Sequence, residues 1–202
     1  MTFQGACLGV FLTLWAGSRA AETPAVPGEE AVTASSPAPA PPAELEGVGL
    51  GEAIANLEPR LGLGGLVAAH RGEDVVYALE RGQPIPDAAR EFLAARSLAR
   101  MEVVFRAGRV TGVEVEYADR RDVLFDDMAA RLRERYGDPA DEVARGPLQV
   151  GRAKGIRLLM WLRIWTWTWD DRTLIVEGEH FGDRKDRETA ARHTYRFKLR
   201  AG

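Results

Sequence analysis

The chain has 202 residues, of which 46% are hydrophobic and 28% are charged, and its formal net charge is -3. These values are typical of a soluble globular protein. A charge this close to neutral gives no electrostatic reason to expect nucleic acid or an anionic membrane surface as a partner.

Residues 1–20 are predicted to be a signal peptide. The apolar run "GACLGVFLTLWAG" has the length of a signal-peptide core and is short for a membrane span. Small Ser18 and Ala20 precede "AE", which predicts cleavage after Ala20 and export to the periplasm or the extracellular space. No Lys or Arg precedes the run, so the alternative is an uncleaved membrane anchor. The only cysteine, Cys7, would be lost on cleavage, and the mature chain would then have no thiol.

Residues 21–46 are predicted to form a disordered spacer. The segment "AETPAVPGEEAVTASSPAPAPPAELE" is rich in proline and alanine and has no aromatic residue. Such a composition cannot bury enough apolar surface to offset the entropy lost on ordering. The remaining residues, 47–202, are expected to form a single domain.

In the first part of this domain, the patterns predict a helix at Glu52–Leu61, a strand at Val75–Glu80 and a helix at Asp87–Arg96. The stretch "LARMEVVFRAGRVTGVEVEYAD" alternates like a β-hairpin. Matching its apolar faces places Met101 opposite Val113, with the three-residue loop Arg106-Ala107-Gly108 and Gly108 in the left-handed conformation.

A helix is predicted next in "RRDVLFDDMAARLRERYGDP", with Phe125, Met128, Leu132 and Tyr136 on one face. Acidic residues suit its start, basic residues suit its end, and the Gly137 and Pro139 pair stops it. A final alternating strand is expected at Thr194–Leu199.

The stretch "WLRIWTWTWDDRTLIVEGEH" holds four of the five tryptophans and is predicted to be a second hairpin. If Asp170-Asp171 is a two-residue turn, Trp169 lies opposite Arg172, Trp167 opposite Leu174 and Trp165 opposite Val176. The tryptophan face is then mainly apolar, which favours a place in the core. The alternative is an exposed binding face that stacks on sugar rings or bases, formed by Trp161, Arg163, Trp165, Trp167 and Trp169.

An internal similarity aligns "EAIANLEPRLG" with "DMAARLRERYG", so that Leu57 matches Leu132 and Gly62 matches Gly137. A helix followed by an antiparallel hairpin, twice, predicts an α+β fold with the helices packed on one face of an antiparallel sheet.

The segments "FRAGRV" and "RERYGDP", within roughly 40 residues, resemble the two-layer modules of the beta-lactamase-inhibitor-protein type and the small outer-membrane assembly lipoproteins. The resemblance implies a non-enzymatic, protein-binding envelope module and carries no functional residue.

Motifs for catalysis are absent from the sequence. The segment 47–202 has one serine, Ser97, outside any G-x-S-x-G elbow, and its glycine pairs match no phosphate-binding or cofactor-binding motif. The histidines form no H-E-x-x-H motif, and the alternative of a hydrolase depends on a composite site of Glu179, His180, Asp183 and His193. We therefore expect an exported, non-catalytic module without cofactor or metal that binds an unidentified envelope protein.

Overall fold

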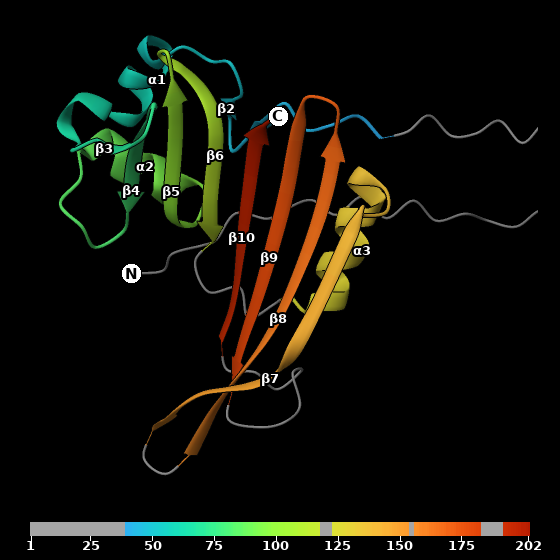
Figure 1. Cartoon of the computed structure of the whole chain (residues 1–202). Coiled ribbons are helices and arrows are strands. Elements are labelled where there is room, and N and C mark those ends of the chain that lie inside the picture. Colours follow the sequence, from blue (N-terminus) through green and yellow to red (C-terminus); the bar gives the residue numbers. More distant parts are fainter. Residues whose placement is uncertain (1–38, 118–122, 154–155, 183–191) are drawn as a thin grey trace, which may run out of the picture. The chain divides into compact units, whose positions relative to one another are not determined.

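The domain is built on one large antiparallel sheet, drawn in Figure 1. The structure is a computed structural model, and it describes residues 39–117, 123–153, 156–182 and 192–202. These residues belong to one compact unit, Pro37–Gly202. The predicted signal peptide and residues 21–38 of the predicted spacer lie outside the described residues.

The described strands and helices follow one another in this order: β1 (Glu44–Leu45), β2 (Val48–Gly49), α1 (Ile54–Leu61), η1 (Leu63–Gly65), β3 (Ala69–Arg71), β4 (Asp74–Glu80), α2 (Asp87–Ala95), β5 (Leu98–Arg106), β6 (Arg109–Tyr117), α3 (Phe125–Tyr136), β7 (Asp141–Ala153), β8 (Ile156–Trp169), β9 (Arg172–Gly182) and β10 (Arg192–Ala201). Eight of these strands form one sheet in the order β3-β4-β5-β6-β10-β9-β8-β7. Every neighbouring pair is antiparallel, and with its helices the fold is of the predicted α+β class.

The helix predicted within residues 120–139 is confirmed as α3, and the reason for its end is visible in the structure. Asp126 and Asp127 lie in the first turn of α3, where the helix dipole favours negative charge. Gly137 follows the last turn with φ 76 and donates its backbone N–H to Arg133 O at 2.8 Å. Only glycine adopts such a positive φ without steric strain, so the helix stops where the sequence predicts.

The β5–β6 hairpin is confirmed, but its predicted register is wrong. Met101 pairs with Val115, not with Val113, and Arg106 pairs with Arg109. The turn therefore has two residues, Ala107 (φ 49) and Gly108 (φ 74), and both take the left-handed conformation of a type I′ turn. The extra residue expected in the loop lies in strand β6 at Thr111, where the register shifts between Val104 and Phe105.

The register predicted for the tryptophan hairpin is confirmed. Trp169 pairs with Arg172, Trp167 with Leu174 and Trp165 with Val176, which leaves Asp170-Asp171 as the turn. Here a one-residue slip would move every side chain to the other face, so the contrast between the two faces determined the register.

Strands β1, β2, β3 and β7 were not predicted. The most consequential is β7, a strand of 13 residues at the edge of the sheet. Its sequence "DEVARGPLQVGRA" contains a Gly-Pro pair and has no sustained alternation, so it carries little of the pattern by which a half-buried strand is recognised.

The predicted boundary at residue 46 lies too late, because the last residues of the predicted spacer pack on the domain. Leu45 pairs with Val48 and is only 8% exposed. Arg172 Nη1 donates to Pro42 O at 3.0 Å, and Arg96 Nε donates to Glu46 O at 3.1 Å. One buried leucine and these hydrogen bonds to backbone carbonyls order a segment whose composition alone predicts disorder.

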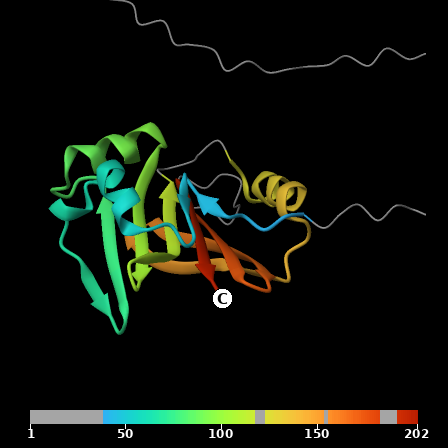
Figure 2. The same cartoon turned by 90° about the horizontal axis from the view of Figure 1, so that it is seen from above.

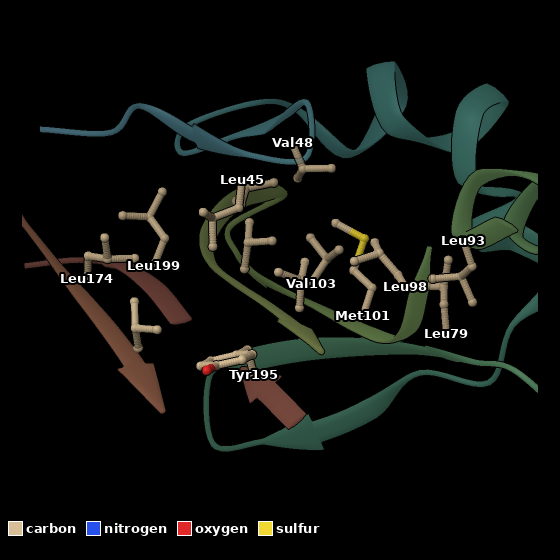
Figure 3. Packing of buried hydrophobic residues seen from close by; sticks show 14 of the residues in the cluster. Leu45, Val48, Leu79, Leu93, Leu98, Met101, Val103, Leu174, Tyr195 and Leu199 are labelled. Atoms are coloured by element: carbon tan, nitrogen blue, oxygen red, sulfur yellow. The ribbon is translucent and has the colours of Figure 1, made fainter. Parts of the chain in front are cut away.

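One face of the sheet, which we call the inner face, forms the core. Cross-strand pairs place Leu79, Met101, Val115 and Phe197 in one row, and Leu199 with Leu174 and Trp167 in another. Residues of the inner face and buried residues of all three helices belong to a single hydrophobic cluster. Figure 3 shows part of it, with Leu45 and Val48 above the sheet residues and Leu93 of α2 beside Leu79.

Candidate functional site

The residues of the predicted tryptophan binding face lie on the inner face of β8, and most are buried. Trp161, Trp165 and Trp167 are 7%, 0% and 3% exposed, and Trp169 is partly buried. Figure 2 shows α3 from above, beside the sheet, and two aromatic residues of α3 make edge-to-face contacts with Trp165 and Trp167. The ring of Phe125 lies 6.3 Å from that of Trp165, and the ring of Tyr136 lies 5.8 Å from that of Trp167.

Arg163, the charged member of this set, is held by helix α3 and strand β7. Its guanidinium contacts Asp126 at 2.9 Å and Glu142 at 3.8 Å, and its side chain is 18% exposed. The indole N–H of Trp167 is satisfied by Gly137 O at 3.0 Å. These contacts join β8 to α3, so Trp161, Trp165 and Trp167 belong to a buried packing surface.

Two residues of the predicted composite site, His180 and His193, do come together. They are cross-strand partners on β9 and β10, and their rings stack with centroids 3.8 Å apart. Phe125 stacks on the other side of His180 at 3.5 Å. Both histidines are buried, at 1% and 2% exposure, so this three-ring stack lies inside the core.

The polar contacts of this stack involve a neighbouring tyrosine and a loop carbonyl. His180 Nε2 lies 3.2 Å from the Tyr195 hydroxyl, which donates to Val123 O at 3.0 Å, and His193 Nδ1 lies 3.1 Å from the same carbonyl. Burial raises the pKa of the Tyr195 hydroxyl, and Asp127 adds to the effect.

The acidic members of the composite site do not join the histidines within the described structure. Glu179 follows the opposite alternation along β9, so it lies on the other face of the sheet, and Asp183 lies outside the described residues. In the part of the chain that the structure describes, no three His, Cys, Asp or Glu side chains are grouped so as to hold a metal ion.

Glycine at position 178, which was not among the predicted site residues, makes this packing possible. A Cβ at Gly178 would lie 2.7 Å from Phe125 Cε1 and 3.0 Å from Tyr195 Cε1. The aromatic rings therefore occupy the space that a side chain would need. A glycine in the middle of a strand is a general indication of such a close approach.

The opposite face of the sheet, the outer face, is charged where β6, β10 and β9 form it. Arg196 contacts Glu116 at 2.9 Å and Glu177 at 3.1 Å, and Lys198 contacts Glu177 at 2.8 Å. Cations and carboxylates alternate across the three strands, so the charges compensate one another and no large field of one sign results.

Along β8 the outer face is mainly apolar, and this apolar row continues into the end of the β7–β8 hairpin. Leu162 and Ile164 are partly buried, and Leu158 and Met160 continue the same alternation. Beyond the pair Leu159 and Gly182, no described residue of β9 accompanies β8, and Figure 1 shows this end of the hairpin reaching past the neighbouring strands.

Three large apolar side chains are exposed at this end of the hairpin. Leu148 is 42% exposed, Val150 46% and Leu158 39%. We call these three residues the hairpin patch. The only other exposed large apolar side chain in the described ranges is Val67, so three of the four lie near one end of the β7–β8 hairpin. A local concentration of this kind is typical of an interaction surface, whereas single exposed apolar residues are ordinary.

No helix in the described part of the chain is long and apolar enough to cross a membrane. Comparison of the chain with protein-family models, with curated protein sequences and with solved structures finds no match.

Proposed function

We propose that this protein is an exported, non-catalytic α+β module that binds a protein partner of the cell envelope through the hairpin patch. The observation that carries the proposal is the concentration of Leu148, Val150 and Leu158 at the end of one hairpin. Burying three such side chains against a partner would contribute several kcal/mol, at about 25 cal/mol per Å² of apolar surface.

The two alternative functions have less support. Stacking on a sugar or a base needs an exposed ring face, and Trp161, Trp165 and Trp167 are buried. A hydrolase would need a histidine within reach of substrate and water, and His180 and His193 are buried in a ring stack.

Export is part of the proposal and depends on residues 1–20. We propose that they act as a signal peptide and leave a periplasmic or extracellular protein, or that they remain as a membrane anchor. The resemblance to beta-lactamase-inhibitor-protein modules and to small outer-membrane assembly lipoproteins supports the same assignment, since both are envelope modules that bind proteins.

The finer architecture is also proposed: three helices on the inner face, and two repeats of a helix followed by a hairpin. In support, Leu57 of α1 and Leu132 of α3 are both buried, at 0% and 5% exposure, as their alignment requires. Gly62 and Gly137 both follow their helices with positive φ, at 60 and 76. In this proposal, the hairpin β5–β6 belongs to the repeat that begins with α1, and the hairpin β8–β9 belongs to the repeat that begins with α3.

The proposed function is tested by cross-linking pull-down from an envelope fraction with the double variant Leu148→Ser, Leu158→Ser. We expect the wild-type chain to capture a defined partner and the double variant to capture it at least about tenfold less, because an apolar contact worth 1.4 kcal/mol or more is lost. The matched control is Val67→Ser, which changes a side chain that is 95% exposed and lies elsewhere.

Circular dichroism should show the same folded spectrum for all three proteins. Equal capture by the wild-type chain and the double variant would show that the hairpin patch does not bind the partner. Loss of capture with Val67→Ser would show that the effect is not specific to the hairpin patch.

A further inference from the structure

The first residues of β7 form an open edge of the sheet. In the strand order the two edge strands are β3, with three residues, and β7, with 13. Along residues 141–145, every side chain is exposed except that of Val143, which is partly buried. An edge strand leaves one row of backbone N–H and C=O groups unpaired, and another strand can pair with it.

The sequence of this edge, "DEVAR", complements itself. If two copies pair antiparallel about Val143, Asp141 of each copy lies opposite Arg145 of the other, and Val143 lies opposite its counterpart. Residues 141, 143 and 145 share the outer face because side chains alternate along a strand, and their β8 partners are Thr166, Ile164 and Leu162. Two opposite-charge pairs therefore flank one apolar pair, which favours this register.

The charges needed for this pairing are available. Neither Asp141 nor Arg145 forms an ion pair with any residue in the described ranges. The neighbouring Glu142 is already engaged, since it contacts Arg133 at 2.6 Å and Arg163 at 3.8 Å. A register shifted by one residue, with Glu142 opposite Arg145, would compete with these contacts.

The end of the self-complementary segment coincides with the end of regular pairing. Pro147 has no N–H to donate, and register shifts follow between Arg145 and Leu148 and between Gln149 and Gly151. These irregularities protect the remainder of β7 from pairing and leave residues 141–145 as the open part of the edge.

We propose that two copies of this chain associate through antiparallel pairing of residues 141–145, with reciprocal ion pairs between Asp141 and Arg145. The interface is isologous and closes as a two-fold dimer, because each copy presents the same segment to the other. This goes beyond the proposed function and does not depend on it, since the hairpin patch lies outside the paired segment.

Sedimentation-velocity ultracentrifugation of the purified chain tests the proposal. We expect a monomer–dimer equilibrium for the wild-type chain. Asp141→Arg or Arg145→Asp alone should raise the dissociation constant at least about tenfold, because each places like charges opposite one another. The double variant Asp141→Arg, Arg145→Asp should restore the dimer, since the charges are then exchanged.

A mixture of the two single variants gives the sharpest result. In the mixed pair, one copy carries two positive and the other two negative side chains at positions 141 and 145, so a heterodimer should form although neither variant self-associates. The control Glu73→Arg makes the same charge change at a side chain that is 85% exposed, and should leave the dissociation constant unchanged.

The proposal is overturned if the wild-type chain sediments as a monomer at all concentrations, if the mixture stays monomeric, or if Glu73→Arg disrupts the dimer equally. The experiment uses the purified chain alone, so its failure leaves partner capture by the hairpin patch untouched. Conversely, if the chain forms the dimer but captures no envelope protein, the proposed function is refuted and the proposed dimer is supported.

Discussion

At the scale of single residues, the tryptophans of β8 illustrate what alternation in a sequence can and cannot establish. It identified the side chains that share a face, and the confirmed register shows that this step was sound. What covers that face depends on a helix about 30 residues earlier, whose Phe125 and Tyr136 provide the cover. The apolar face of that helix was itself predictable, so the core interpretation followed from two local patterns taken together.

Trp167→Ala should greatly destabilise the domain. The side chain is 3% exposed, contacts Tyr136 and donates its indole N–H to Gly137 O at 3.0 Å. Removing it leaves a cavity and an unpaired carbonyl, which together cost about 3–5 kcal/mol. Urea unfolding followed by circular dichroism measures the change. Thr168→Ala, at an exposed position on the other face, should stay within about 0.5 kcal/mol, and an equally small effect at Trp167 would contradict the packing described.

Alkaline pH should destabilise the protein partly through Tyr195. Burial raises the pKa of its hydroxyl above the ordinary value of 10.0, so the folded state keeps the proton more tightly than the unfolded state. The stabilisation is complete below about pH 10 and is lost as pH rises further, by up to about 1.4 kcal/mol per pH unit. Tyr195→Phe should flatten the fall in the free energy of unfolding between pH 9 and 11. Identical slopes for the two proteins would argue against the effect.

At the scale of elements, prediction succeeded where a local pattern was sufficient and failed where it was not. Helix α3 had a clear apolar face and a glycine stop, and the tryptophan hairpin had two contrasting faces. Strand β7 has no clear apolar face and no sustained alternation. It lies at the edge of the sheet, where one side has no partner strand and a Gly-Pro pair is therefore tolerated. The predicted β5–β6 register was wrong because a shift of two residues leaves the same side chains on each face of the hairpin. The face pattern therefore does not distinguish the two registers, and only the turn does.

Ala107→Asn should stabilise the β5–β6 hairpin. Ala107 takes φ 49, a left-handed conformation that costs an alanine about 1–2 kcal/mol and that asparagine tolerates better. Asn-Gly is also the preferred pair for a type I′ turn. We expect the free energy of unfolding to rise by roughly 0.5–1 kcal/mol in urea titrations. Ala107→Val should lower it instead, and a stabilising effect of valine would show that the turn is not of this type.

At the scale of the whole molecule, the order of strands depends on contacts that no local pattern reports. The sheet places β10, the last strand, between β6 and β9, and this brings His193 onto His180 and Tyr195 beside them. The two histidines, expected together for their chemistry, are cross-strand partners in the sheet. Their burial could not be predicted, because it depends on Phe125 stacking over His180 from a separate element.

The ordered end of the predicted spacer provides a test at the same scale. Chains starting at residue 39 and at residue 47 differ by β1, whose Leu45 is 8% exposed, and by the carbonyls of Pro42 and Glu46 that bind Arg172 and Arg96. The shorter chain should be less stable by at least roughly 3 kcal/mol, because it loses one buried leucine and several hydrogen bonds, including those from Arg172, Arg96 and Tyr117. In the longer chain, Leu45→Ala should account for about 2 kcal/mol of this difference. Equal stability of the two chains in urea unfolding would show that residues 39–46 lie against the domain without stabilising it, and would restore the boundary that composition alone suggests.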